Sequence, residues 1–318
     1  MKISHGTHIK NMDDTNGYGY ATANMIASLE RLGHEVTKND KTADVEIWFD
    51  QPHNWKFSKG PYKIGYHPWE STLLKDGWAE IMNQCDEIWT PSPIIAEWYR
   101  NYSGITVPVY VYEHGVDPIW KPVQRPVEDR FKFLHVGGEA ARKGVTETMK
   151  AFRRAFPNNR DVELSLKIIS EGWKVGHINR INIINRRSSL ENLIKMFHEH
   201  HAYVYPSWGE GFGLTPLQAM ATGMPTITVP GWAPYARFLN PKLCVDSKFN
   251  KTQWPTLHPG NMLRPNVDDL IEAMRHTYNN YEAVEADAHA RVDEIMAYYD
   301  WDRLTKETFD SLAERLEK

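Results

Sequence analysis

Several features that mark particular protein classes are scarce in this sequence of 318 residues. Its two cysteines, Cys85 and Cys244, lie far apart and outside any metal-ligand spacing, which excludes a disulfide framework and favours small, partly buried residues. No stretch approaches the roughly 20 apolar residues that span a bilayer. Residues 1–6 lack the apolar run of a signal peptide, so we expect a cytoplasmic location. A net charge of −4 gives no overall attraction to nucleic acid or acidic lipid.

The signatures of several enzyme classes are also missing. Residues 17–22 lack the third glycine of a dinucleotide fingerprint, which argues against nicotinamide binding, and the chain has no Gly-x-Ser-x-Gly elbow. The Asp300-Trp-Asp302 segment is similar to a metal-binding Asp-x-Asp, but it precedes an amphipathic helical pattern, and we interpret it as a helix N-cap. His198, His200 and His201 have no companion acidic motif. We therefore expect no bound metal and no cofactor.

Short apolar runs alternate with helical patterns along most of the chain, which predicts an α/β fold with parallel, doubly wound sheets. The expected strands are 2–4, 44–49, 63–67, 87–90, 107–112, 131–136, 162–169, 181–184, 202–205 and 226–229. The expected helices are 20–32, 72–83, 93–102, 145–156, 190–200 and 216–221, and residues 267–318 read as helical almost throughout. The proline-rich, charged stretch 117–130 predicts a linker between two Rossmann-like halves.

The most specific motif covers residues 206–223, which follow an expected strand and open an expected helix. Gly209, Gly211 and Gly213 would let the backbone approach a ligand closely, because no Cβ intervenes. The free amides and the dipole of a helix N-terminus favour an anionic group such as a diphosphate. Since the dipole at an exposed end is worth only about 0.3–1 kcal/mol, we expect a cation to assist.

The same motif carries signals for both ends of its helix. Thr215 suits the N-cap, Pro216 the first helical position, and Gln218 the third position of a capping box. Gly223 is placed to end the helix in a left-handed conformation.

A candidate cation lies in the segment 131–144, where an expected strand runs into a glycine turn and then into a helix. Arg142 and Lys143 follow that turn, at the carboxyl edge of a parallel sheet where ligands of such folds bind. Either side chain could neutralise a departing diphosphate. Taken alone, the segment is equally well explained as a solvated basic loop.

Together these segments resemble the retaining GT-B glycosyltransferases of the large family four, over most of the chain. Residues 210–218 are similar to that family's E-x7-E motif, 219–227 to its continuation, and 136–144 to its donor-phosphate turn. Residues 114–117 resemble the family's Asn-Gly-Val-Asp motif. Residues 17–19 resemble the glycine loop of its first domain, and residues 32–36 the end of the helix that follows that loop. Residues 64–72 and 85–92 are similar to a Trp-Glu-containing branch of the family. Six matches in the family's order make the resemblance specific.

The resemblance implies roles position by position. Glu210 would bind hydroxyls of the donor sugar, and Lys143 would hold the diphosphate with help from Arg142. Gly17 and Gly19 would close over the diphosphate from the other domain. The residues to which the resemblance gives a catalytic role are Glu210, Lys143, Arg142 and His67. Those it assigns to the donor are Gly17, Gly19, Gly137, Gly138, Gly211, Phe212, Gly213, Leu214, Thr215 and Gln218.

Two positions depart from the family pattern. Gln218 stands where the family has a second glutamate that contacts the ribose, so ribose contact and a purely capping role remain alternatives. Gly138 stands where the family usually has an arginine in the phosphate turn, and Arg142, next to Lys143, is the candidate substitute.

Aromatic and acidic residues of the first half give candidates for sugar or acceptor contacts. His67 ends an expected strand, with Trp69 and Glu70 close behind it. The functional interpretation is a contact to the donor sugar or acceptor hydroxyl, and the structural one is a histidine satisfied by a backbone carbonyl. For Trp208 and Phe212, the two interpretations are stacking near the sugar and packing within the loop.

These observations predict an α/β, GT-B architecture in which two Rossmann-like domains with parallel sheets face each other across a cleft. Residues 1–122 form the acceptor-side domain, joined by a C-terminal helix, 301–318, that crosses back, and 123–300 form the nucleotide-sugar-binding domain. The expected activity is metal-independent transfer of a sugar from a nucleoside diphosphate, UDP or GDP for example, to an acceptor hydroxyl, with retention at the anomeric carbon.

Three alternatives share the fold. A GT-B sugar-nucleotide epimerase would need no acceptor. A glycosyltransferase acting on modified DNA bases would need a DNA acceptor, which the near-neutral charge disfavours. A non-catalytic, glycosyltransferase-like partner subunit is suggested by the departures at Gly138 and Gln218. The sequence identifies neither the base, the sugar nor the acceptor.

Overall fold

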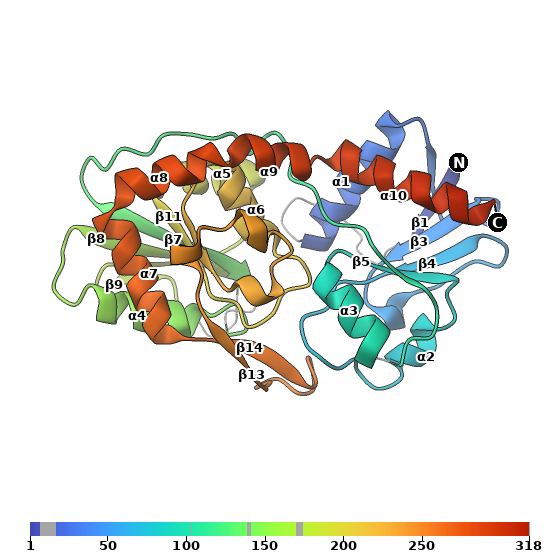
Figure 1. Cartoon of the computed structure of the whole chain (residues 1–318), viewed down its shortest axis with the longest axis horizontal. Coiled ribbons are helices and arrows are strands. Elements are labelled where there is room, and N and C mark those ends of the chain that lie inside the picture. Colours follow the sequence, from blue (N-terminus) through green and yellow to red (C-terminus); the bar gives the residue numbers. More distant parts are fainter. Residues whose placement is uncertain (7–16, 103, 139–140, 170–173, 318) are drawn as a thin grey trace. The chain divides into compact units, whose positions relative to one another are not determined.

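The computed structural model describes residues 1–6, 17–102, 104–138, 141–169 and 174–317, which cluster into two compact units (Figure 1). The first unit comprises Met1–Asp117, Lys251–Asn261 and Tyr298–Lys318, and the second comprises Pro118–Asn250 and Met262–Ala297. The chain first passes from one unit to the other at Asp117, inside the proline-rich stretch. Each unit has its own sheet and core, as the alternating pattern predicts.

The first unit is built on a six-stranded parallel sheet in the order β2-β1-β3-β4-β5-β6. Every residue of β3 and β5 is buried, because a parallel sheet is covered on both faces. The strands are β1 (Lys2–Gly6), β2 (Glu35–Lys38), β3 (Val45–Phe49), β4 (Tyr62–Tyr66), β5 (Glu87–Thr90) and β6 (Val109–Val111). The helices are α1 (Gly17–Arg31), α2 (Trp78–Met82), α3 (Pro93–Tyr102) and α10 (Trp301–Leu316), with a 3-10 turn η1 (Pro52–Asn54).

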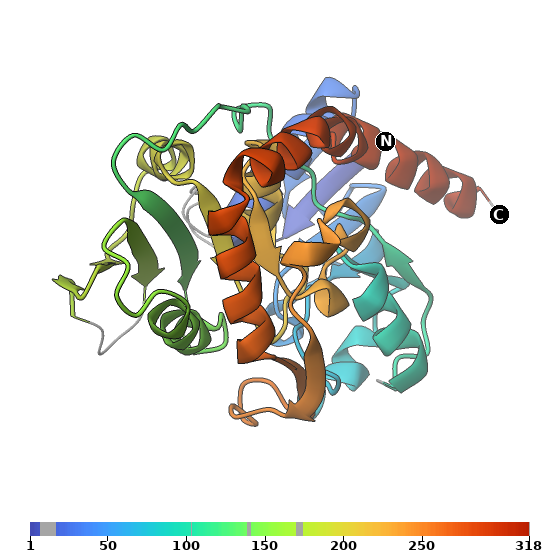
Figure 2. The ribbon, with the colours of Figure 1, turned by 60° about the vertical axis from the view of Figure 1, so that its left-hand side comes forward.

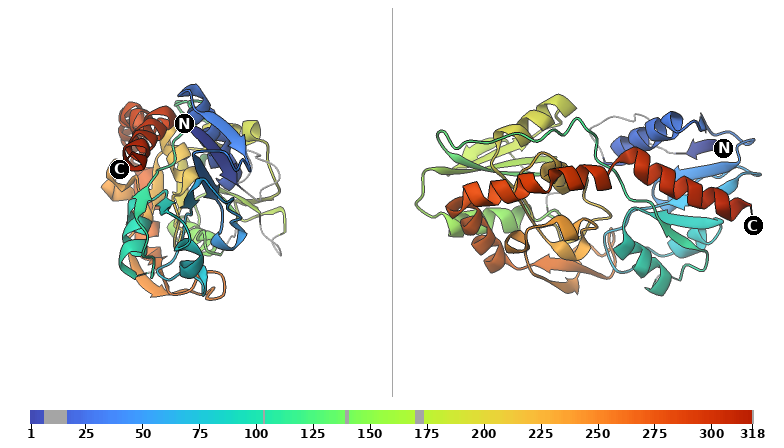
Figure 3. Two further views of the ribbon diagram at one scale, coloured as in Figure 1. Left: turned by 90° about the vertical axis from the view of Figure 1, so that its right-hand side faces the viewer. Right: turned by 45° about the horizontal axis from the view of Figure 1, so that its top comes forward.

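The C-terminal helix α10 packs against α1 within the first unit (Figure 3). The carboxylate of Asp300 accepts a hydrogen bond from the amide of Arg303 at 2.8 Å, which confirms Asp300 as the N-cap. Asp302 accepts bonds from Ser28 Oγ and from Arg31, both at 2.6 Å. These acids therefore serve the helix, and the metal-binding alternative has no support here.

The prediction of a helix over residues 72–83 is wrong except near the C-terminal end of that segment. Only α2 is helical, and Gly77, with φ of 78°, precedes it in a left-handed conformation that no α-helix contains. Side-chain bonds hold the residues before it: Trp69 Nε1 and Ser71 Oγ both donate to the carbonyl of Leu73. The amphipathic spacing of this segment reflects packing of a turn rather than of a helix.

The second unit contains a six-stranded sheet in the order β12-β11-β7-β8-β10-β9, parallel except for the edge strand β9. Helices α4 and α7 lie side by side (Figure 2). The strands are β7 (Phe131–Gly138), β8 (Val162–Ile169), β9 (Gly176–Ile178), β10 (Ile181–Asn185), β11 (Ala202–Tyr205) and β12 (Thr226–Thr228). The helices are α4 (Val145–Ala155), α5 (Leu190–Glu199), α6 (Leu214–Ala221), α7 (Val267–Asn279), α8 (Tyr281–Ala290) and α9 (Val292–Tyr298).

Short elements that lack a strong apolar period are the ones the sequence did not predict. They include β2, β9 and a two-stranded sheet of β13 (Ser247–Lys251) and β14 (Asn261–Pro265). The 3-10 turns η2 (Pro230–Trp232), η3 (Ala236–Phe238) and η4 (Pro241–Leu243) each carry a proline or follow one closely. The sequence places residues 251–261 in the second domain, whereas they cluster with the first unit, where the ring of His258 lies 5.2 Å from that of Trp69.

Candidate functional site

The strand order of the second unit fixes where a ligand can bind. From β7 the chain continues to β8 and β10 on one side, then returns to β11 on the other side of β7. In parallel α/β sheets, ligands bind at the carboxyl ends of the strands where the order reverses in this way. The loops that follow β7 and β11 are therefore the candidate site, and they contain Arg142, Lys143 and Glu210.

The turn between β7 and α4 packs tightly against the segment that follows β11. Gly144 has φ of 78°, and a Cβ there would lie 2.2 Å from the carbonyl oxygen of Pro206, so no larger residue fits. Gly137 lies against the stem of Lys143, whose Cγ would be 3.1 Å from a Cβ at position 137. The glycines thus bring the Arg142–Lys143 backbone onto the Pro206 segment.

The carboxylate of Glu210 is the centre of the site. Lys143 Nζ lies 2.7 Å from both of its oxygens, and Arg142 lies 3.5 Å from Oε1. Ser207 Oγ and Tyr205 OH also donate to Oε1, at 2.6 and 3.0 Å. Arg142 donates in addition to the carbonyl of Gly209 at 2.6 Å. Oε1 therefore has several donors around it. For Oε2 the structure gives one donor, Lys143, so this oxygen can still accept a hydrogen bond from a ligand hydroxyl.

The charge of Glu210 is maintained although the residue is only 5% exposed. Burial raises the pKa of its carboxyl, but the charges of Lys143 and Arg142 and the bonds from Lys143 and Ser207 outweigh burial, so the pKa lies below its usual value. Glu210 is thus a carboxylate at neutral pH. The pair of cations beside it leaves the pocket with net positive charge among these three side chains.

The N-terminus of α6 faces the same loop, but its geometry differs from the expected capping box. Gly213, with φ of 83°, is the N-cap, and the helix begins at Leu214, two residues earlier than predicted. The hydroxyl of Thr215 instead accepts a bond from Tyr203 OH at 2.8 Å. The Thr215 N-cap prediction is wrong because the left-handed glycine starts the helix without a side-chain cap. Gly223, with φ of 72°, does end the helix as predicted.

The remaining predicted donor residues of this loop are mostly buried. Phe212 is 3% exposed and packs edge-on against Tyr235, and Trp208, also 3% exposed, donates from Nε1 to Glu147. These contacts favour the loop-packing interpretation of both rings. Gln218 is 5% exposed on the first turns of α6. Gly211 is buried beside Glu210, and Gly138 is exposed at the end of β7.

Three further residues belong to the site without a predicted role. Tyr205 and Ser207 hold Glu210; Tyr205 directly precedes the motif and Ser207 is its second residue, so their position before the glycines was an available signal. His135 is fully buried, stacks on Tyr205 at 5.5 Å, and bonds through Nδ1 to the carbonyl of Val204. Burial is the main cause that lowers its pKa to about 4, so His135 is neutral.

The predicted residues of the first unit lie around the carboxyl end of β4. His67 is 1% exposed, and its Nδ1 lies 2.7 Å from Tyr99 OH, so this nitrogen is bonded to a tyrosine hydroxyl and not to the backbone carbonyl of the structural interpretation. Trp69 is 3% exposed between His67 and Trp78. Glu70 lies 3.5 Å from Nδ1 of His258.

We expected Gly17 and Gly19 in a loop ahead of the helix. Instead, α1 begins at Gly17, and both glycines lie in its first turn. Residues 7–16, which precede them and include Asn16 of the expected glycine loop, lie outside the described residues.

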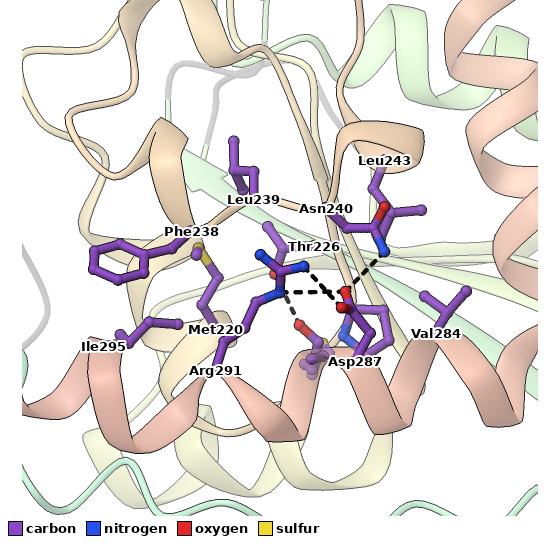
Figure 4. A pocket seen from close by; sticks show the side chains of 13 residues that line it. Met220, Thr226, Phe238, Leu239, Asn240, Leu243, Val284, Asp287, Arg291 and Ile295 are labelled. Carbon is purple, nitrogen blue, oxygen red and sulfur yellow. Dashed lines mark hydrogen bonds and ion pairs between the residues drawn. The ribbon is translucent and has the colours of Figure 1, made fainter.

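Other kinds of site find little support in the described part of the chain. There, no group of three or more His, Cys, Asp and Glu side chains could hold a metal ion, and no helix is both long and apolar enough to cross a membrane. A cavity of about 20 Å³ lies among α6, β12 and α8, beside Asp287, which accepts bonds from Asn240 and Arg291 (Figure 4). That volume suits a water molecule rather than a nucleotide sugar.

Comparisons with known proteins bear on the family and on the fold. Residues 116–248 match the family model of the glycosyl transferases group 1. The fold is similar to that of sucrose-phosphate synthase from Thermosynechococcus elongatus, with a TM-score of 0.73, 12% identity, and coverage of 100% of this chain and 99% of the other. It is similar to HepE from Anabaena in complex with UDP and glucose, with a TM-score of 0.70, 11% identity, and coverage of 99% and 100%.

A third solved structure, WaaG, a glycosyltransferase involved in lipopolysaccharide biosynthesis, gives a TM-score of 0.66 at 12% identity, with coverage of 98% of this chain and 99% of the other. The comparison with curated proteins gives no match. The matched family model covers the loops after β7 and β11, and the matched structures cover both units. Residues 116–248 are thus similar to the group 1 glycosyl transferases, and the chain has the GT-B fold.

Proposed function

We propose that this protein is a glycosyltransferase that moves a sugar from a nucleoside diphosphate to an acceptor hydroxyl, with retention at the anomeric carbon and without a metal ion. One observation carries the proposal: at the carboxyl edge of β7 and β11, the ammonium of Lys143 and the carboxylate of Glu210 lie 2.7 Å apart beside the N-terminus of α6. A cation and helix amides suit a diphosphate, and a carboxylate suits sugar hydroxyls.

The chemistry needs stabilisation of the leaving group above all. As the bond between the anomeric carbon and the diphosphate oxygen breaks, negative charge develops on the diphosphate. Lys143 and Arg142 lie where they can balance that charge, and each well-placed donor of this kind is worth about 3–4 kcal/mol. Two cationic side chains fill the role for which other enzymes use a divalent ion, which supports the metal-independent proposal.

Glu210 would orient the sugar. Its side chain is held by Tyr205 and Ser207, so its position is fixed before the donor arrives, and its Oε2 can accept a bond from a sugar hydroxyl. The acceptor hydroxyl would then attack the anomeric carbon from the face that the diphosphate leaves, as the family resemblance implies, and its proton would pass to the departing diphosphate. The cytoplasmic location expected from the sequence stays a prediction.

The direct test is a thermal-shift screen with UDP-, GDP-, ADP- and TDP-sugars. A ligand at 100 times its dissociation constant adds about 2.7 kcal/mol of stability, so the bound nucleotide is readily identified. The stabilising donor is then incubated with hydroxyl acceptors, with and without EDTA, and the anomeric configuration of the product is read by NMR. We expect a product of retained configuration that forms equally well with EDTA.

The outcomes separate the alternatives. No stabilisation by any of the four donors would overturn the proposal and favour a non-catalytic subunit. Conversion of the donor sugar without any acceptor would instead identify an epimerase. Transfer only to oligonucleotides that carry hydroxymethylated bases would identify the DNA acceptor.

A further inference from the structure

Trp208 lies two residues before Glu210, and all three of its polar groups are bonded, each to a different segment of the second unit. Its amide donates to the carbonyl of Arg142, in the turn after β7, at 3.0 Å. Its carbonyl accepts a bond from the amide of Leu263, in β14, at 2.8 Å. Its indole Nε1 donates to Oε1 of Glu147, in the first turn of α4, at 3.2 Å. The loop after β11 is therefore tied to three other segments through one residue.

The bond between Trp208 and Glu147 joins the two segments that carry the site. Glu210 follows Trp208 by two residues, and Lys143 precedes Glu147 by four. The 2.7 Å distance from the ammonium of Lys143 to each carboxylate oxygen of Glu210 therefore depends on how these segments are held together. The tie between Trp208 and Glu147 is made by side chains, so it can be removed without altering the backbone bonds.

Ser207 carries any movement of Trp208 to the carboxylate. Its Oγ donates to Oε1 of Glu210 at 2.6 Å, and its carbonyl accepts a bond from Trp232 Nε1 at 2.9 Å. Ser207 and Gly209 are joined to Trp208 by peptide bonds. A displacement of Trp208 would therefore move Ser207 on one side and Gly209 on the other, and Glu210 with them.

The surroundings of the indole make its bond to Glu147 costly to lose. Trp208 is buried, and the guanidinium of Arg264 lies 5.8 Å from the centre of its ring. A buried indole N–H needs an acceptor, and a carboxylate is a stronger acceptor than a neutral group. If Glu147 offered no oxygen, the N–H would stay unsatisfied or the loop would move to satisfy it.

We propose that Trp208 and Glu147 are positioning residues of the transfer reaction, whose bond sets where Glu210 holds the sugar relative to the diphosphate at Lys143. The inference rests on the proposed function, because both residues act through Glu210 and neither acts on the donor directly. A reacting group that is misplaced by about 1 Å can lose about a hundredfold in rate, so a small shift of Glu210 is enough to slow transfer.

The test is Trp208→Phe, which keeps a buried ring and removes the N–H. Calorimetry compares binding of the nucleotide sugar identified by the screen with binding of its free nucleoside diphosphate, and a kinetic assay gives kcat. We expect the nucleotide sugar to bind about tenfold more weakly and kcat to fall about ten- to a hundredfold. The affinity for the free nucleoside diphosphate should stay unchanged, because its phosphates are assigned to Lys143 in the other segment.

Variants of Glu147 test the same bond from the acceptor side, and they decide the question if Trp208→Phe does not fold. Glu147→Leu removes the acceptor and should reproduce the losses expected for Trp208→Phe. Glu147→Gln keeps an oxygen that can accept from Nε1, so it should restore most of the donor affinity and of kcat. If the two variants of Glu147 behave alike, the bond is not the cause, and the inference is wrong.

A double-mutant cycle shows whether Trp208 acts through Glu210. The cycle combines Trp208→Phe with Glu210→Gln and is measured by binding of the nucleotide sugar, which the phosphates sustain in all variants. We expect Trp208→Phe to weaken binding in the wild type and to have little further effect when Glu210 is already Gln. Equal weakening in both backgrounds would mean that Trp208 acts elsewhere, and would overturn the inference.

The matched control is Trp48→Phe, in the first unit. Trp48 is also buried, and its Nε1 donates to Oε1 of Glu46 at 3.1 Å, so the lost bond has the same chemistry and nearly the same length. We expect both phenylalanine variants to lower the melting temperature, but only Trp208→Phe to weaken binding of the nucleotide sugar. If Trp208 were merely structural, donor affinity and kcat would respond alike in the two variants, and the inference would fall.

Failure of the proposed function gives a different result. If the wild type binds no nucleotide sugar, or binds one and transfers nothing, the proposed function fails and this inference fails with it. If the wild type transfers sugar and Trp208→Phe does so equally well with unchanged donor affinity, only the inference about Trp208 and Glu147 fails.

Discussion

At the scale of single residues, the site depends on the hydrogen bonds and ion pairs of one buried carboxylate, that of Glu210. Glu210 receives bonds from Lys143 in the turn after β7, from Ser207 in its own loop and from Tyr205 at the end of β11. The cation proposed for the phosphate and the acid proposed for the sugar are bonded to each other.

The first residue-scale prediction concerns Lys143→Ala. Because the ammonium would balance charge on the leaving diphosphate, we expect transfer to slow by about two orders of magnitude. The measurement is kcat with the donor identified by the screen. Lys143→Gln, which keeps a hydrogen-bond donor, guards against loss of folding, and Lys150→Ala on the exposed face of α4 is the control. Unchanged turnover in a folded variant would remove Lys143 from this role.

The second prediction concerns Glu210→Gln. The amide preserves size but loses the charge, so bonds to sugar hydroxyls weaken while Lys143 stays available to the phosphates. We expect transfer to fall severely and the affinity for the free nucleoside diphosphate to change little. Calorimetry with the nucleotide and a kinetic assay with its sugar separate the two effects. A collapse of nucleotide affinity would mean that Glu210 contacts a different part of the donor.

At the scale of elements, the start of α6 decides the shape of the anion-binding turn. Gly213 is left-handed, and a Cβ there would lie 2.5 Å from Tyr235 Oη and 2.7 Å from the ring of Trp232. Tyr235 OH also donates to the carbonyl of Gly213 at 2.9 Å. The aromatic side chains of Trp232 and Tyr235 therefore leave space only for a glycine at position 213, where the helix begins.

The element-scale prediction compares Gly213→Ala with Gly33→Ala. Both glycines have nearly the same φ, 83° and 85°, but a Cβ at Gly33 meets nothing within 4 Å. Gly33→Ala should cost only backbone strain, of order 1–3 kcal/mol, in the free energy of unfolding. Gly213→Ala should cost more and should also weaken nucleotide binding. Denaturant unfolding and calorimetry measure the two effects, and equal losses for both variants would show that the aromatic contacts are unimportant.

At the scale of the whole molecule, both units bury neutral histidines. Burial lowers the pKa of His67 and of His114 to about 3, and of His135 and of His200 to about 4. In the unfolded chain each would titrate near 6.5. Between these values the unfolded state binds more protons than the folded state, so stability rises with pH across this window.

We therefore predict that the free energy of unfolding falls as pH is lowered from 7 toward 4, before the carboxylates titrate. His200→Gln should flatten this dependence, because it removes one group with a folded pKa of about 4. His177→Gln, an exposed residue of β9, is the control and should leave the slope unchanged. Urea unfolding at pH 7, 6 and 5 gives the slopes. Identical slopes for His200→Gln and the wild type would contradict the assignment.

Strongly patterned elements were predictable because their own residues decide them. Strands β5, β8 and β11 and helix α3 have the predicted bounds, since each combines a clear apolar period with flanking breakers. The 72–83 segment has a helical period, but Gly77 and the bonds to the Leu73 carbonyl decide its conformation. Thr215 likewise offers a cap, but Tyr203 OH takes its hydroxyl.

By itself, the sequence determined the alternation of strands and helices, the glycine-bearing loops, and the placement of Lys143 and Glu210 just after two of the strands, because these features depend on local chemistry. Only the tertiary structure decided that these two side chains pair and that Tyr205 and Ser207 hold the carboxylate. The physical reason is that strand order and register set which distant residues become neighbours, and no local pattern encodes that order.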